Sequence, residues 1–181
     1  MPVFPKPKFA YAYSPAQEIQ RLRAHKAHRQ IPAKSAGTLL LGTWNLANFG
    51  AQESRDQDKR LYAEILGWFD LVAVQEVRDN FGDLVDVVRT MGGNTAVHMS
   101  DVLGNDERLA YVYDKAKVTL LENVGHIALP PKEYPNVKLK GITRKFNGFD
   151  RAPCLATFQV GGFTMLLANV HQFPTKRDLA G

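Results

Sequence analysis

Residues 71–79 read Leu-Val-Ala-Val-Gln-Glu-Val-Arg-Asp, and the rest of the chain can be organised around this stretch. Four apolar residues in a row indicate a strand that is covered on both faces, because a strand with one face in water would alternate apolar and polar residues. The stretch then turns polar at Gln75 and Glu76. A carboxylate beside a dry core has to be paired, metal-bound or placed at the edge of a cleft. We therefore take Glu76 as the centre of a predicted site.

Two other predicted strands also end with an apolar run followed by polar side chains. The strand at 38–45 ends at Asn45, and the last predicted strand is followed by His171. Asn169 and His171 are two positions apart, so they point to the same face of an extended strand. Glu107 opens a further predicted strand. None of these residues is specific by itself, since a single histidine at a strand end is more often structural than catalytic.

The remaining elements follow from apolar periodicity and from turn residues. A capping box, formed by Ser14 with Gln17 and again by Ser54 with Gln57, predicts the start of a helix at each site. Further elements are a helix at 81–91, strands at 94–100, 107–113, 118–121, 151–160 and 163–170, and a long loop at 125–150.

The positive charge of the chain is concentrated in its first residues. The formal net charge is +5, and residues 1–37 alone carry seven Lys or Arg against one acid. We predict that 1–37 form a basic arm and linker, and that 38–181 form the folded domain. Residues 132–151 hold a second basic excess. Such patches attract polyanions, but charge alone favours ordinary solvated surface charge and a floppy tail as their explanation.

The composition gives no sign of a membrane or secreted protein. No apolar run approaches the roughly 20 residues of a membrane span, and the N-terminus lacks the apolar core of a secretory signal. Cys154 is the single cysteine and lies among apolar residues, which predicts a buried strand residue rather than a nucleophile. We expect a cytoplasmic protein.

Five motifs in a fixed order are much more specific than any single residue. The motifs are GTWNLANFG (42–50), FDLVAVQEVRD (69–79), NDERLAYVYD (105–114), FDRAPCLATF (149–158) and LLANVH (166–171). Together they resemble the endonuclease/exonuclease/phosphatase superfamily, whose fold is deoxyribonuclease I-like, over about residues 38–171. The resemblance implies an α/β fold, a four-layer sandwich of two packed sheets with helices outside.

The resemblance also implies a metal-dependent cleavage of phosphate esters. Glu76 matches the metal-binding glutamate of the family, and Asn45 matches the asparagine beside the metal and the scissile phosphate. One carboxylate with phosphate oxygens and water suits Mg²⁺, with Mn²⁺ as the alternative. His171 matches a histidine that contacts the phosphate, and Glu107 matches the acid that orients this histidine.

Two further residues are expected to contact the substrate. Arg151 matches an arginine that reaches the substrate backbone, and Asn169 shares the strand face of His171. Ala47 stands where apurinic endonucleases of the family carry an aspartate, which argues against that branch.

The resemblance covers the N-terminal two-thirds of the family pattern. The later Asp-x-Asn and Asp-His motifs have no counterpart in the chain, and these residues would align and deprotonate the attacking water. We therefore expect a fold that is incomplete at its C-terminus, with an unpaired strand edge and exposed apolar surface. We also expect little or no phosphodiesterase activity from this chain alone.

The predicted function is that of a metal-dependent phosphodiesterase, an endonuclease or exonuclease with nucleic acid as its partner and no membrane. Two alternatives stay open. A phosphomonoesterase or lipid phosphodiesterase of the same fold would share every motif. A catalytically dead remnant that binds nucleic acid through the basic arm would show metal-independent binding and no cleavage.

Overall fold

The structure is a computed structural model that describes residues 12–51, 54–102, 106–138, 140–141, 143 and 145–172. Its elements are, in chain order, α1 (Pro15–His28), β1 (Leu41–Phe49), α2 (Asp56–Leu66), β2 (Leu71–Val77), α3 (Gly82–Met91), β3 (Thr95–Met99), β4 (Arg108–Asp114), β5 (Thr119–His126), the 3₁₀ helix η1 (Pro131–Asn136), β6 (Cys154–Val160) and β7 (Phe163–Asn169).

The first sheet is mixed, with strand order β1-β2-β4-β3. β2 lies in its interior, parallel to β1 and antiparallel to β4. On one face of β2, Val72 and Val74 pack with Leu84 and Val87 of α3, and on the other face Leu71 belongs to a separate core. The prediction of a strand buried on both faces is therefore confirmed.

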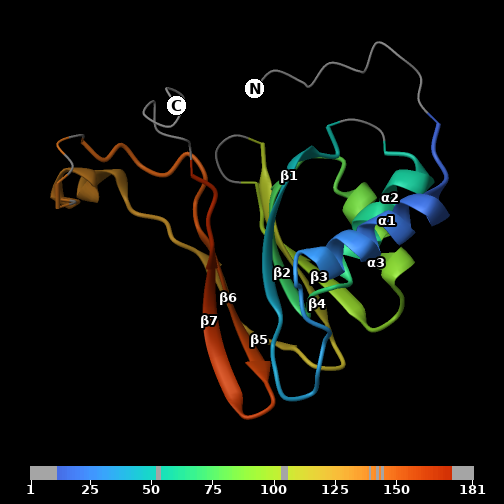
Figure 1. Cartoon of the computed structure of the whole chain (residues 1–181). Coiled ribbons are helices and arrows are strands. Elements are labelled where there is room, and N and C mark those ends of the chain that lie inside the picture. The colour runs from blue at the N-terminus through green and yellow to red at the C-terminus, as the bar shows by residue number, and fades with distance from the viewer. Residues whose placement is uncertain are drawn as a thin grey trace.

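The second sheet is antiparallel, with strand order β5-β6-β7. It packs face to face on the first sheet, and Figure 1 shows the helices on the opposite side of the first sheet. Tyr111 of β4 and Phe158 of β6, both fully buried, meet edge to face at 5.2 Å between the two sheets. The described layers are thus helices, first sheet and second sheet.

The outer face of the second sheet carries exposed apolar side chains. Leu166 is 58% exposed and Val170 is 45% exposed. Among the described residues, the only strand that pairs with β7 in a sheet is β6. Both features match the expected unpaired edge and exposed apolar surface.

Helix α1 is docked on α2 rather than extended into solvent. Arg23 donates two hydrogen bonds to the Glu64 carboxylate at 3.0 and 2.9 Å, and the Lys26 ammonium lies 5.8 Å from the centre of the Trp68 ring. No residue of α1 is buried, so polar contacts at its edge hold the helix in place. The division of the chain at residue 37 remains a prediction. In the described part of the chain, no helix is long and apolar enough to span a membrane.

Some predicted boundaries are wrong. α2 is capped by Arg55 with Asp58, one position after the predicted Ser54 box, and the Arg55 backbone N–H donates to Asp58 Oδ2 at 3.2 Å. β1 begins at Leu41 rather than 38, and the Leu40 backbone N–H donates to the buried Asp70 carboxylate at 2.8 Å. β5 is longer than predicted, and the predicted loop contains η1.

Candidate active site

The backbone is distorted where β1 and β2 end. The β1–β2 register shifts between Asn45 and Phe49, and the β2–β4 register shifts between Val74 and Val77. Within these irregularities Ala47, Asn48 and Glu76 have φ angles of 53°, 61° and 61°. Residues other than glycine rarely adopt such angles, and bulges of this kind re-aim side chains next to functional sites. The distortion marks this end of the sheet as a candidate site.

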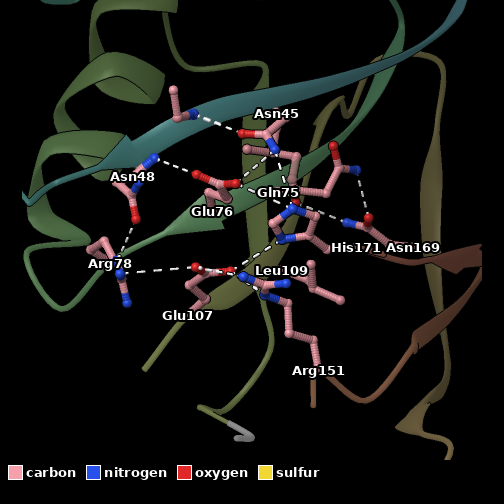
Figure 2. Close-up of polar contacts among 12 residues, drawn as sticks. Asn45, Asn48, Gln75, Glu76, Arg78, Glu107, Leu109, Arg151, Asn169 and His171 are labelled. Carbon is pink, nitrogen blue, oxygen red and sulfur yellow. Dashed lines mark hydrogen bonds and ion pairs between the residues drawn. The ribbon is translucent and has the colours of Figure 1, made fainter. Parts of the chain in front are cut away.

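Glu76 lies at the centre of a small polar network. The Asn45 amide donates to Glu76 Oε1 at 2.9 Å, and the Asn48 backbone N–H donates to Glu76 Oε2 at 2.8 Å. His171 Nε2 lies 3.2 Å from Glu76 Oε1 and 3.3 Å from the Asn45 amide nitrogen. Figure 2 shows His171 reaching this carboxylate from the end of the second sheet. The structure therefore brings together three strand ends that the sequence had suggested separately.

Glu107 forms a second, buried cluster beside the first. Its carboxylate accepts Arg151 Nε–H at 2.5 Å and Nη2–H at 3.2 Å, and His171 Nδ1 lies 3.1 Å from Oε2. The Glu107 and Arg151 side chains are only 1% and 4% exposed. A second cation, Arg78, lies 3.9 Å from Oε1. Glu107 therefore holds one nitrogen of the His171 ring and leaves the other nitrogen facing Glu76.

The surroundings of Glu107 favour its ionised form. Burial by itself would raise the pKa of this carboxyl group, but the hydrogen bonds and charges of Arg151 and His171 outweigh burial and lower the pKa. The carboxylate is therefore a permanent acceptor for the histidine ring near neutral pH. This contact agrees with the predicted role of Glu107 in orienting His171, and the role itself remains a prediction.

Asn169 joins the two sheets behind the site. Its amide donates to the backbone oxygens of Val74 at 2.9 Å and Ala110 at 3.0 Å, and its Oδ1 accepts from Gln75 Nε2 at 2.7 Å. It is 2% exposed, whereas His171, two residues later, reaches the polar network. This burial gives no support to the predicted contact between Asn169 and substrate, which stays a prediction.

Arg151 is likewise committed to the protein interior. Its guanidinium binds Glu107 rather than facing an open surface. In the structure Arg151 anchors Glu107, a contact that does not bear on substrate binding. Its predicted contact with the substrate backbone therefore also stays a prediction.

Three residues of the network were not predicted from the sequence as site residues. Gln75 binds Asn169, Asn48 binds Glu76 through its backbone, and Arg78 donates to Asn48 Oδ1 at 2.8 Å. Gln75 and Arg78 flank Glu76 in the motif that was taken as the centre of the site. Polar residues at the end of an apolar strand therefore indicate site residues, and this pattern applies to Gln75 and Arg78 as well as to Glu76.

The donor set fits a hard divalent cation at Glu76 better than at Glu107. One ligand atom each from Glu76, Glu107 and His171 lies within 4.8 Å of the others. Arg151 already occupies both Glu107 oxygens, whereas Glu76 is contacted by the Asn45 amide, the Asn48 backbone N–H and the His171 imidazole. Carboxylate and amide oxygens are preferred ligands of Mg²⁺. Glu76 would hold the ion, and the metal itself remains to be tested. Asn45 turns its amide nitrogen to Glu76, while its Oδ1 accepts from the Ala47 backbone N–H at 2.8 Å, so Asn45 would have to rotate its amide to supply an oxygen ligand.

A larger hollow lies at the other end of β2 and does not coincide with this network. It has a volume of about 720 Å³ and is lined by residues that include Lys34, Asp70, Lys117 and Phe163. Because none of the predicted site residues lines it, the polar network at the end of the strands is the better candidate for chemistry.

Sequence comparisons give no match: the chain fits no protein-family model and none of the curated proteins. Comparison with solved structures does give matches. The structure is similar to that of D. rerio TDP2 humanized by 14 mutations, with a TM-score of 0.51 and 17% identity over 77% of this chain and 52% of that chain.

Two further solved structures are similar at lower TM-scores. A functionally unknown conserved protein from Enterococcus faecalis V583 gives 0.47, with 20% identity over 72% of this chain and 52% of the other. The human Nocturnin catalytic domain with bound sulfate gives 0.41, with 17% identity over 69% of this chain and 47% of the other. This chain thus spans about half the length of the solved chains that it matches. The likeness to the TDP2 structure confirms the predicted deoxyribonuclease I-like fold.

Proposed function

We propose that this chain carries the metal-binding and phosphate-binding half of a phosphodiesterase site that acts on nucleic acid. The observation that supports the proposal most strongly is the convergence of Glu76, Glu107 and His171 at the ends of strands from both sheets. Such a cluster combines a carboxylate for a divalent cation with an imidazole for an anionic phosphate.

Glu76 and Asn45 are the proposed ligands of the cation. When bound, Mg²⁺ would polarise a phosphate oxygen as a Lewis acid. The backbone N–H of Asn48 holds the second oxygen of Glu76, so the carboxylate is fixed before any ion arrives. Fixed ligands of this kind reduce the reorganisation that binding would otherwise require.

His171 is the proposed contact to the reacting phosphate. Donation from Nδ1 to Glu107 sets the orientation of the ring and leaves Nε2 at the centre of the network. From this position a protonated Nε2 can donate to a phosphate oxygen and stabilise charge that develops there. Arg151 acts one step further away, because its guanidinium holds Glu107 in place.

The charge of the chain supports a polyanionic substrate. Residues 1–37 carry seven Lys or Arg against one acid, and the side chains of Arg21 and Arg23 on α1, although paired with Glu18 and Glu64, are 73% and 66% exposed. Clustered exposed cations supply the sequence-independent part of nucleic-acid affinity. This favours a nucleic acid over a small phosphate ester as the substrate class.

A chromogenic diester tests the proposal. Thymidine 5′-(p-nitrophenyl phosphate) has a good leaving group, so slow hydrolysis can be measured. We expect slow release of p-nitrophenolate that requires Mg²⁺ or Mn²⁺, stops with a chelator, and falls at least about tenfold in Glu76→Gln and in His171→Ala, since positioned groups contribute about 10²–10⁴-fold. Asp56→Asn, which alters an exposed acid of α2 away from the network, is the matched control and should keep the wild-type rate.

The alternatives give different results in the same assay. Faster hydrolysis of p-nitrophenyl phosphate than of the diester would indicate a phosphomonoesterase. Oligonucleotide binding without metal and without any release would indicate a non-catalytic nucleic-acid-binding protein. Hydrolysis that survives both Glu76→Gln and chelation would overturn the proposal.

A further inference from the structure

The segment between β5 and β6 has a small aromatic cluster of its own. The Tyr134 and Phe146 rings lie 5.3 Å apart at 83°, and the Phe146 and Phe149 rings lie 5.1 Å apart at 76°. Figure 1 shows this segment, in orange, standing away from both sheets. The cluster therefore organises a projecting segment and adds nothing to the main core.

The cluster holds a defined backbone in place. Gly148 has a φ of +100°, and a Cβ at this position would lie 2.7 Å from the Tyr134 hydroxyl oxygen. Tyr134 is itself positioned by η1, where the Val137 backbone N–H donates to the Tyr134 carbonyl oxygen at 3.2 Å. A side chain at residue 148 would force Tyr134 away, so this glycine is required for the observed packing.

Phe149 is the exposed end of the cluster. It is 43% exposed, while Tyr134 and Phe146 are partly buried. Packing against Phe146 holds the Phe149 ring, and a held ring loses little conformational entropy when a flat ligand stacks on it. An exposed, supported aromatic ring is the kind of platform on which a base can stack.

The same segment is strongly basic. Residues 132–151 carry six Lys or Arg against two acids, and Lys132, Lys138, Lys140 and Lys145 are all exposed. Exposed lysines in the same segment as an exposed aromatic ring match a ligand that is flat in one part and anionic in another. A nucleotide has both properties, whereas an apolar partner protein would gain nothing from the lysines.

The platform lies next to the proposed site along the chain. Phe149 is two residues before Arg151, which holds Glu107, so their Cα atoms are at most about 7.6 Å apart. We propose that Phe149 and the lysines of this segment bind single-stranded nucleic acid, with an unpaired base stacked on Phe149. Its placement beside the reacting phosphate rests on the proposed function, but base stacking itself does not.

Binding measured without cleavage tests this inference. Fluorescence anisotropy measures the affinity of the full chain, in the presence of a chelator, for two labelled ligands. One is an oligothymidylate, and the other is an abasic oligomer of the same length and charge. Stacking of one base on an aromatic ring raises affinity by about tenfold. We expect Phe149→Ala to weaken oligothymidylate binding by about tenfold, to leave abasic-oligomer binding unchanged, and Phe149→Trp to restore affinity.

Matched variants separate stacking from charge and from misfolding. Phe163→Ala removes a ring that is 62% exposed and lines the hollow at the other end of the sheets, so it should leave affinity unchanged. Lys138→Ala combined with Lys145→Ala should weaken both oligomers equally and flatten the salt dependence. Unchanged thermal melting in Phe149→Ala, together with rescue by Phe149→Trp, shows that the fold is intact.

Other outcomes overturn the inference. Equal losses for the oligothymidylate and the abasic oligomer in Phe149→Ala, or no loss for either, would show that Phe149 stacks no base. Tighter wild-type binding to a duplex, or Phe149-dependent binding to anionic vesicles in place of oligonucleotides, would assign the surface to another ligand. Diester hydrolysis that survives Glu76→Gln and chelation, with Phe149-dependent binding intact, would reject the proposed function alone.

Discussion

His171 Nδ1 lies 3.1 Å from Glu107 Oε2, although the two residues are 64 positions apart in the chain. Glu107 directly precedes β4 of the first sheet, and His171 follows β7 of the second sheet. The contact therefore fixes the two sheets against each other at the end where Glu76 lies. It also gives the histidine one defined orientation, which a residue just past a strand end would otherwise lack.

Loss of the Arg151 guanidinium should destabilise the fold strongly. Arg151→Ala leaves the buried Glu107 carboxylate without its main partner, and breaking a buried pair from one side costs about 3–5 kcal/mol. The double variant Glu107→Gln with Arg151→Ala should lose clearly less, because no uncompensated charge remains. Urea unfolding of the variants measures this. A double variant less stable than Arg151→Ala would show that the pair is not coupled in this way.

The same pair should make stability depend on acid pH. Because the Glu107 pKa is lowered in the folded state, the carboxylate adds stability above its unfolded value of 4.5, and that stability is lost as the pH falls through the folded pKa. Without Arg151, burial would raise the Glu107 pKa, so the destabilisation by Arg151→Ala should shrink towards low pH. Unfolding free energies measured down to about pH 4 check this. A stability difference that stays constant with pH would contradict it.

The sequence predicted this part of the molecule in outline. The apolar runs before Asn45, Glu76 and His171 located three strand ends, and the resemblance located Glu107 and Arg151. For β2 the apolar run reflects burial on both faces, whereas β1 and β7 keep an apolar run although one face of each is exposed.

The sequence did not predict which polar residues would face inward. Asn169 and His171 have the same alternation along a strand, yet one is 2% exposed and the other reaches the polar network. The difference arises from backbone oxygens of β2 and β4 that happen to lie opposite Asn169. The positive φ of Glu76 and the docking of α1 likewise depend on contacts between distant segments, which periodicity does not report.

Asn169 should therefore matter for stability. Asn169→Ala removes the donor to the Val74 and Ala110 carbonyl oxygens, and each buried group left unsatisfied costs about 1–3 kcal/mol. Asn136→Ala, which alters an exposed amide on η1, is the control and should change the unfolding free energy little. A cost for Asn169→Ala as small as that of the control would show that water replaces the lost bonds.

Cys154 should be inert in the folded protein. It is 1% exposed, as predicted for a strand cysteine, and burial raises the pKa of its thiol. We expect no reaction with a thiol-specific disulfide reagent under native conditions and stoichiometric reaction in denaturant. Rapid modification of the native protein would mean that the space between the sheets opens readily.

The central claim is that Glu76 is the ligand of a divalent cation, and calorimetric titration with Mn²⁺ tests it most directly. We predict a single class of site in the wild-type protein, its loss in Glu76→Gln, and its retention in Asp101→Asn, which changes an exposed carboxylate outside the network. Thermal melts establish that both variants are folded. Equal Mn²⁺ affinity in the wild-type protein and in folded Glu76→Gln would contradict the account.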